Sequence, residues 1–177
     1  MTQTHTRIRP LPTFTGLLVI GAACAWLVAQ GMAPLAASVA AVLLGAATAV
    51  AAHGLSRAAS VADGLRWLLW PQIAAVVVIT WMAYLHILPT DLLRVPNIDK
   101  VLHFTLFGMV AFFGELWLDG KRVWRLPVAV VLPFGLAAAE ELAQTLSPHR
   151  TADLGDLACD LGGMALGWLL ARQLLRR

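Results

Sequence analysis

The sequence is poor in charged residues. Asp, Glu, Lys and Arg make up 13% of its 177 residues, whereas hydrophobic residues make up 59%. In soluble domains, about a quarter of all residues are charged, so this composition excludes an ordinary soluble domain. The chain also contains several apolar runs of about 20 residues, which is the length that crosses a bilayer as a helix. The scarcity of charge therefore predicts a membrane protein.

The sequence also lacks the common signatures of metal and nucleotide sites. Its two cysteines, Cys24 and Cys159, lie in separate apolar runs, so they form neither a disulfide framework nor a metal-binding spacing. There is no H-E-x-x-H or G-x-S-x-G motif and no glycine-rich phosphate loop. We therefore expect no cofactor.

Apolar runs along the chain predict an all-α fold, a polytopic membrane bundle of six transmembrane helices. The spans are expected at residues 16–32, 35–52, 67–88, 98–118, 126–146 and 152–172. The first run resembles a signal peptide, but a second follows at once, so we expect an uncleaved span. We divide the chain into a two-span N-terminal extension, 1–66, and a four-span core, 67–177.

Basic residues are distributed unevenly between the two predicted faces. With six spans, most of the 13 lysines and arginines lie on the side of the two termini. The positive-inside rule places this side in the cytoplasm, which predicts a multi-pass protein of the bacterial plasma membrane. Because the basic residues flank apolar segments, we read the net charge of +3 as an orientation signal. We therefore expect no nucleic-acid partner.

Ionisable residues gather at the predicted outer ends of the last three spans. They form three groups: Asp99, Lys100 and His103; Glu140, Glu141 and Gln144; and Arg150, Asp153, Asp156 and Asp160. Residues three, four or seven positions apart share one face of a helix. Charge at membrane depth is costly and marks a functional site by default. We expect the three groups to meet in one site.

The residue types suggest acid–base chemistry at this site. We assign catalysis to Asp99, His103, Glu141 and Asp156, and substrate binding to Lys100, Gln144, Arg150, Asp153 and Asp160. Asp99, four residues before His103, would orient its imidazole as in many general bases. Glu141 has the three-residue spacing to Gln144, so we place it in the site and Glu140 at the rim.

Arg150 is the expected anion clamp, because a guanidinium group matches phosphate or carboxylate with two hydrogen bonds. An ion pair with Asp153 is its other expected role, and the two can coexist. The many carboxylates could also hold a divalent cation through oxygen ligands, and we keep this as an alternative to a metal-free site.

The order of these motifs resembles the VanZ-like family of membrane proteins. The resemblance rests on Asp99-Lys100-x-x-His103-Phe104, Glu141-x-x-Gln144, Arg150-x-x-Asp153-x-x-Asp156, and Gly163 with Gly167. It covers residues 72–172 and implies a role in resistance to the glycopeptide teicoplanin or in envelope biogenesis. Asp160 stands where the family commonly has Asn. The G-x-x-x-G spacing of the two glycines favours close helix contact.

Three functions stay open at this point. The first is a membrane enzyme, a hydrolase or transferase, that acts on an anionic envelope lipid or glycan intermediate. The second is a non-catalytic binder of such a lipid or of a glycopeptide, or a scaffold protein. The third is a transporter, which is least favoured because we expect no charge in the inner halves of the spans. Membrane lipids are partners in all three, and the oligomeric state is not predicted.

Overall fold

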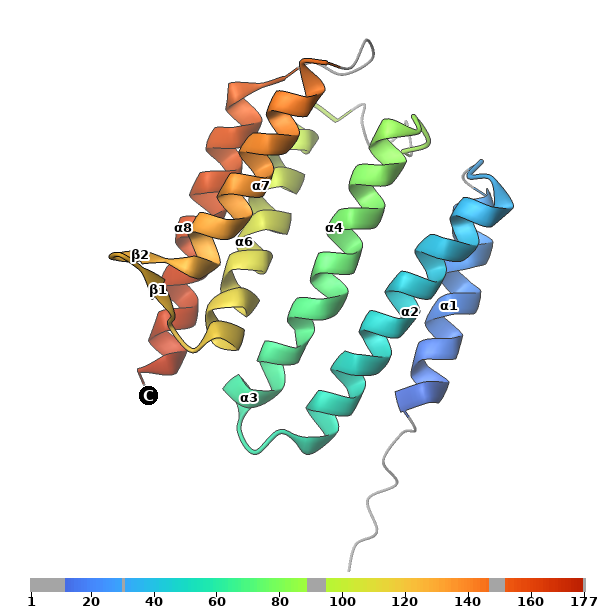
Figure 1. Ribbon diagram of the computed structural model, residues 1–177. Coiled ribbons are helices and arrows are strands. Elements are labelled where there is room, and N and C mark those ends of the chain that lie inside the picture. Colours follow the sequence, from blue (N-terminus) through green and yellow to red (C-terminus); the bar gives the residue numbers. More distant parts are fainter. Residues whose placement is uncertain (1–11, 30, 89–94, 147–151, 177) are drawn as a thin grey trace, which may run out of the picture.

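The computed structural model of the protein describes residues 12–29, 31–88, 95–146 and 152–176, and it shows an all-α bundle (Figure 1). Its long helices are α1 (Pro12–Ala29), α2 (Pro34–Arg57), α4 (Leu69–Tyr84), α6 (Ile98–Leu118), α7 (Val128–Gln144) and α8 (Leu154–Leu175). A short helix α3 (Val61–Leu65) and a 3-10 turn, η1 (Arg66–Leu68), lead directly into α4. The predicted all-α class is confirmed.

Four helical segments of the described chain are long and apolar enough to cross a membrane. They are Pro34–Arg57, Val61–Tyr84, Ile98–Leu118 and Leu154–Leu175. The protein is therefore a multi-pass membrane protein. The described apolar part of α1, Leu18–Ala29, and the 17-residue α7 are shorter, so six crossing helices stay a prediction.

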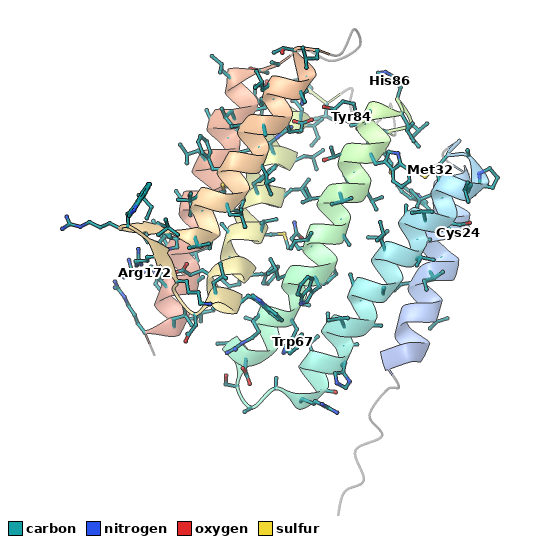
Figure 2. All side chains as sticks on the ribbon, in the orientation of Figure 1. Cys24, Met32, Trp67, Tyr84, His86 and Arg172 are labelled. Carbon is teal, nitrogen blue, oxygen red and sulfur yellow. The ribbon has the colours of Figure 1, made fainter. Side chains whose placement is uncertain are left out.

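The segment that contains α4 has aromatic residues at both of its ends. Trp67 lies near one end and Tyr84 near the other (Figure 2). Tryptophan and tyrosine are enriched where a membrane meets water, because one part of each ring system is apolar and the other forms hydrogen bonds. The segment thus has the anchors expected of a helix that crosses from one interface to the other.

Helices α1 and α2 form a pair at one edge of the bundle, and α4 lies between this pair and the other helices (Figure 1). Their shared core contains Leu27 of α1, Ala37 and Ala40 of α2, and Met82 of α4. Small alanine side chains allow close approach of two helices. This packing joins the N-terminal pair to the rest of the bundle through α4.

Helices α6 and α8 lie in backbone contact. A side chain at Gly163 would overlap the carbonyl oxygen of Phe104, and one at Gly167 would overlap that of Gly108. A Cβ atom on Gly108 would lie 3.0 Å from the carbonyl oxygen of Gly163. The G-x-x-x-G spacing therefore sets the distance between these two helices, as the sequence predicts.

The basic connection between α6 and α7 contains a small antiparallel hairpin, β1 (Arg122–Val123) and β2 (Leu126–Pro127). Trp124 in its turn has a φ of 56° and is 95% exposed. These strands were not predicted from the sequence, because two residues are too few to show the alternation that identifies a strand.

Candidate functional site

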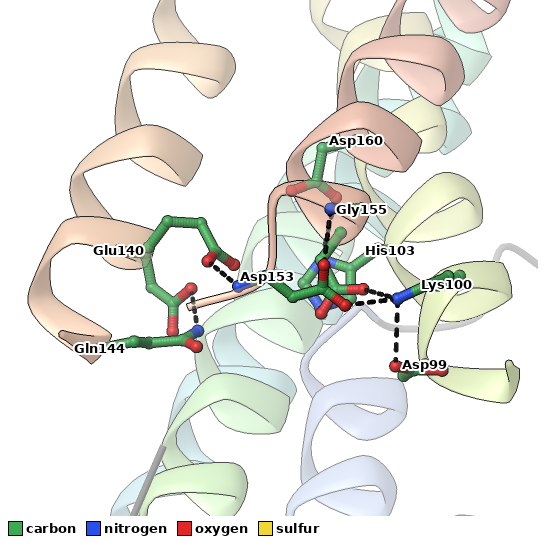
Figure 3. A network of polar contacts seen from close by, with 10 residues as sticks. Asp99, Lys100, His103, Glu140, Gln144, Asp153, Gly155 and Asp160 are labelled. Carbon is green, nitrogen blue, oxygen red and sulfur yellow. Dashed lines mark hydrogen bonds and ion pairs between the residues drawn. The ribbon is translucent and has the colours of Figure 1, made fainter. Parts of the chain in front are cut away.

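Lys100, in the first turn of α6, binds aspartates at the start of α8 (Figure 3). Its Nζ lies 2.6 Å from Oδ2 of Asp153 and 2.9 Å from Oδ1 of Asp156. Oδ2 of Asp99 lies 3.7 Å from the same ammonium group. The lysine predicted to bind substrate is thus already held by carboxylates of the protein.

Asp153 connects this ion-pair cluster to the first turn of α8. Its Oδ1 accepts a 2.7 Å hydrogen bond from the backbone N–H of Gly155, which caps the helix. The hydrogen bond from Lys100 and then that from Gly155 hold the pKa of the Asp153 carboxyl below its usual range. The carboxylate form is therefore favoured at the entrance to the site.

His103 lies about one helical turn beyond Lys100 and faces two aspartates of α8. Its Nδ1 lies 3.0 Å from Oδ1 of Asp160, and its Nε2 lies 3.7 Å from Oδ2 of Asp156. Asp160 is 2% exposed, and an ionised carboxylate only accepts hydrogen bonds, which favours a proton on Nδ1. Nε2 then has a lone pair available to take a proton, as in a general base.

The carboxylate that orients His103 is Asp160, whereas the sequence analysis assigned this role to Asp99. The side chain of Asp99 is 51% exposed and lies near Lys100. A four-residue spacing brings two side chains to one face of a helix but does not make them bond. The close contact between α6 and α8 brings Asp160 within reach of the imidazole instead.

The neighbouring glutamates of α7 take the opposite places from those the sequence predicts. Glu140 lines the cavity described below and accepts a 2.6 Å hydrogen bond from Nε2 of Gln144. Glu141 is 7% exposed, and its Oε2 accepts the backbone N–H of Asp153 at 2.8 Å. Glu140 thus pairs with Gln144, four residues later, and Glu141 instead holds the start of α8.

These side chains surround a cavity of about 380 Å³ between α4, α6, α7 and the start of α8. Its polar lining consists of Thr80, Asp99, His103, Glu140, Gln144, Asp153 and Asp156. Lys100, Glu141 and Asp160 do not belong to this lining but bond to residues in it, as given above. Members of the three sequence groups thus meet around one cavity, and a functional site there stays a prediction. Arg150 lies outside the described residues, so its place stays a prediction as well.

The sequence model of the VanZ/LLP1 family matches residues 34–176. The chain belongs to the VanZ/LLP1 family. The matched region includes α2, which the sequence analysis assigned to the N-terminal extension, so the family region is longer than the predicted core. The division of the chain at residue 66 stays a prediction. Comparisons with curated proteins and with solved structures gave no match.

In this member of the VanZ/LLP1 family, the carboxylates of the site face protein donors. Among the described residues, no group of three or more His, Cys, Asp or Glu side chains is arranged to hold a metal ion. Asp153 and Asp156 face Lys100, and Asp160 faces His103. A divalent cation at the cavity stays an untested alternative.

A second polar cluster lies toward the opposite end of α6, and the sequence analysis missed it. Glu115 is fully buried, and its Oε1 accepts a 3.1 Å hydrogen bond from Nε1 of Trp168 in α8. Arg122 and Arg172 lie 5.6 and 5.1 Å from the centroid of the Trp168 ring. The expectation of no charge in the inner halves of the spans is therefore wrong. A lone glutamate inside an apolar run was the available signal.

Proposed function

We propose that this VanZ/LLP1 protein binds an envelope lipid, a lipid-linked glycan or a glycopeptide at the polar cavity, and that His103 moves a proton of the bound head group. The pairing of His103 with the buried Asp160, beside an open cavity, is the observation that carries this proposal. A buried carboxylate on one imidazole nitrogen raises the basicity of the other and stabilises the charged ring that forms.

The chain's own residues suffice for the proton transfer. Nε2 of His103 takes a proton from a water molecule or a hydroxyl group of the ligand, and that oxygen becomes a nucleophile. Asp160 stabilises the resulting imidazolium through Nδ1. Asp156 lies 3.7 Å from Nε2 and stabilises the same positive charge from the cavity side. Lys100 in turn holds Asp156 in place.

The charge of the cavity limits which head groups it accepts. Its described lining contains four carboxylates and one histidine, and no lysine or arginine. Hydroxyl and amine groups, which donate hydrogen bonds, match this lining. An anionic head group requires Arg150 as its partner, because Lys100 is occupied by Asp153 and Asp156.

The proposal includes a topology with six crossing helices and both termini in the bacterial cytoplasm. The polar cavity then opens at the extracytoplasmic end of the bundle, where envelope intermediates and glycopeptides are found. The distribution of basic residues supports this orientation. Labelling of single cysteines with an impermeant reagent tests it: a cysteine at Ser147 should react in intact cells, and one at Arg122 should not. The opposite labelling pattern would show that the protein has the reverse orientation.

The chemical proposal is tested with purified protein and extracted envelope lipids. Wild-type protein should release a new product detected by mass spectrometry, and His103→Gln should not. His53→Ala, which changes an exposed histidine of α2, is the matched control and should convert lipid normally. If wild-type protein retains a lipid without changing it, the protein is a binder and the catalytic role of His103 is wrong. Full conversion by His103→Gln would also refute that role.

Cells expressing the same variants provide a second readout. Protection against teicoplanin, if this family member confers it, should be lost with His103→Gln and Asp160→Asn but kept with His53→Ala. Thermal stability of each purified variant shows whether a loss of protection comes from the site or from misfolding.

A further inference from the structure

An apolar groove adjoins the polar cavity. It has a volume of about 550 Å³ and runs between α4 and α7, with α6 as its floor. Ile73 and Val77 line it from α4, Trp117 from α6, and Leu132 and Leu136 from α7. Nothing in the chemistry proposed above uses this groove.

The groove and the polar cavity are adjacent and share four lining residues. Val76, Thr80, Phe107 and Glu140 line both of them. Glu140 therefore lies at the junction, with polar side chains on one side and hydrocarbon side chains on the other. One molecule with a polar head and an apolar chain matches this change in lining along its length.

The groove is open toward the bilayer. Val77 of α4 is 48% exposed, and Leu132 and Leu136 of α7 are 61% and 64% exposed. In a membrane, such side chains meet lipid hydrocarbon. A ligand chain can therefore enter sideways between α4 and α7 without leaving an apolar environment, while its head slides into the polar cavity.

We propose that this groove binds a hydrocarbon chain of the ligand whose head occupies the polar cavity. The ligand is then a long-chain amphiphile that enters laterally from the bilayer, with Glu140 at the point where head and chain join. This inference rests on the proposed function for the position of the head. The chain is acyl or isoprenoid, two sources with the same apolar chemistry that the experiment distinguishes.

Photo-crosslinking in vesicles tests the inference. The full-length protein is reconstituted in phosphatidylcholine vesicles with a trace of either phosphatidylglycerol carrying a diazirine in its acyl chain or a diazirine-labelled polyprenyl phosphate. After illumination, labelled peptides are mapped by mass spectrometry. We expect label concentrated on α4 and α7 residues that line the groove, and the stronger of the two probes identifies the type of chain.

Two matched pairs of variants show whether the groove itself is labelled. Val77→Trp fills the groove, whereas Val42→Trp makes the same change on the exposed face of α2, where Val42 is 52% exposed. Leu136→Trp and Leu142→Trp form the corresponding pair on α7, since only Leu136 lines the groove. Val77→Trp and Leu136→Trp should lose the groove label, and their controls should keep it.

Several outcomes would overturn the inference. Equal labelling of all lipid-facing helices would show ordinary bilayer contact, and crosslinks between two protein copies through the groove would make it a dimer interface. A probe with the diazirine in its head group must label α6 or α8 near the cavity. Labelling elsewhere would show that the head group of a groove-bound lipid does not occupy the cavity.

The His103→Gln variant distinguishes this inference from the proposed chemistry. If it keeps the groove label but converts no lipid, both stand. If wild-type protein shows the groove label without any conversion, the chemistry fails and the chain site survives. Conversion without groove label would refute the chain site alone.

Discussion

The interface between α6 and α8 has charged side chains toward both of its ends, but the two ends differ in access. At one end, Lys100 and His103 face aspartates beside an open cavity. At the other, Glu115 is fully buried against Trp168 and lines neither the cavity nor the groove. A charged contact between α6 and α8 is thus common to both ends, and only one of the two ends adjoins a cavity.

The end at Glu115, which we call the sealed end, also has a structural role that the open end at His103 lacks. Trp168 bonds to Glu115 and lies near Arg122 of strand β1. It therefore fastens the α6–α7 hairpin to α8. Replacing a buried ionic group by apolar residues of similar volume changes stability little. Joining two segments is therefore a weak reason to keep a charge, whereas proton transfer requires an ionisable group.

The largest expected effect comes from removing the charge behind His103. Asp160→Asn should lower lipid conversion by about 10²–10⁴-fold, the usual contribution of general-base catalysis, because His103 loses the carboxylate that holds the proton on Nδ1 and stabilises the charged ring. Glu115→Gln changes the same kind of group at the sealed end and should leave conversion unchanged. Initial rates measured on both variants make the comparison, and an equal loss at both ends would abolish the distinction between them.

The next effect concerns the glycine contact between the two ends. Gly163→Ala should lower the free energy of unfolding by about 3 kcal/mol, at the upper end of the usual cost of overpacking, because its Cβ would overlap the Phe104 carbonyl oxygen. At Gly162, a Cβ would lie 3.4 Å from the Phe104 ring, so Gly162→Ala should be tolerated. Thermal unfolding in detergent measures both, and similar melting temperatures would contradict the backbone contact.

A smaller effect is expected at the sealed end. Trp168→Phe removes the side-chain hydrogen-bond donor to Glu115 and should cost about 1–2 kcal/mol of stability, as for a buried polar group left without a partner. Conversion of lipid should not change at a temperature where the variant is folded. A loss of activity without a loss of stability would mean that the two ends are coupled.

The smallest effect is expected at Asp153. Asp153→Ala should lower the melting temperature slightly through loss of the helix cap, and Asp153→Asn should lower it less because an amide oxygen also caps. Lys100 holds the pKa of Asp153 below its ordinary value of 3.8, so the stabilising effect of this carboxylate is complete above that value. It is lost as the pH falls through the lowered pKa.

A pH series of melting temperatures checks this sign. Wild-type protein should lose more stability than Asp153→Asn on acidification below the ordinary pKa of 3.8. Parallel curves for the two proteins would show that the Lys100–Asp153 pair adds nothing to stability.

Helical spacing predicted which helices carry the site but not which side chains pair within it. The three-, four- and seven-residue spacing of Asp153, Asp156 and Asp160 placed all three on one face, and the glycine spacing predicted a close contact with another helix. The partner of His103 depends on contact between two helices. Spacing within one helix favoured Asp99, and that choice was wrong.

Two further features lay beyond the reach of spacing. The directions of Glu140 and Glu141 depend on where the backbone N–H of Asp153 lies, which no pattern in α7 reveals. Within α6, Glu115 has no polar neighbour three or four positions away, so it belongs to no stripe, and its partner Trp168 is 53 residues distant in the chain. Contacts of this kind follow from the packing of the bundle and not from local periodicity.

The glycine contact between α6 and α8 also determines which parts of the protein can move. Backbones that touch at two glycines cannot slide past each other without steric overlap, so α6 and α8 act as one rigid body. The ion pairs and hydrogen bonds of Lys100 and His103 lie on this body, which keeps these groups preorganised. We therefore expect the adjustment that admits or releases a ligand to come from α4 or α7, at the hydrogen bonds that join them to this body: Gln72 to Leu106 and Glu141 to Asp153.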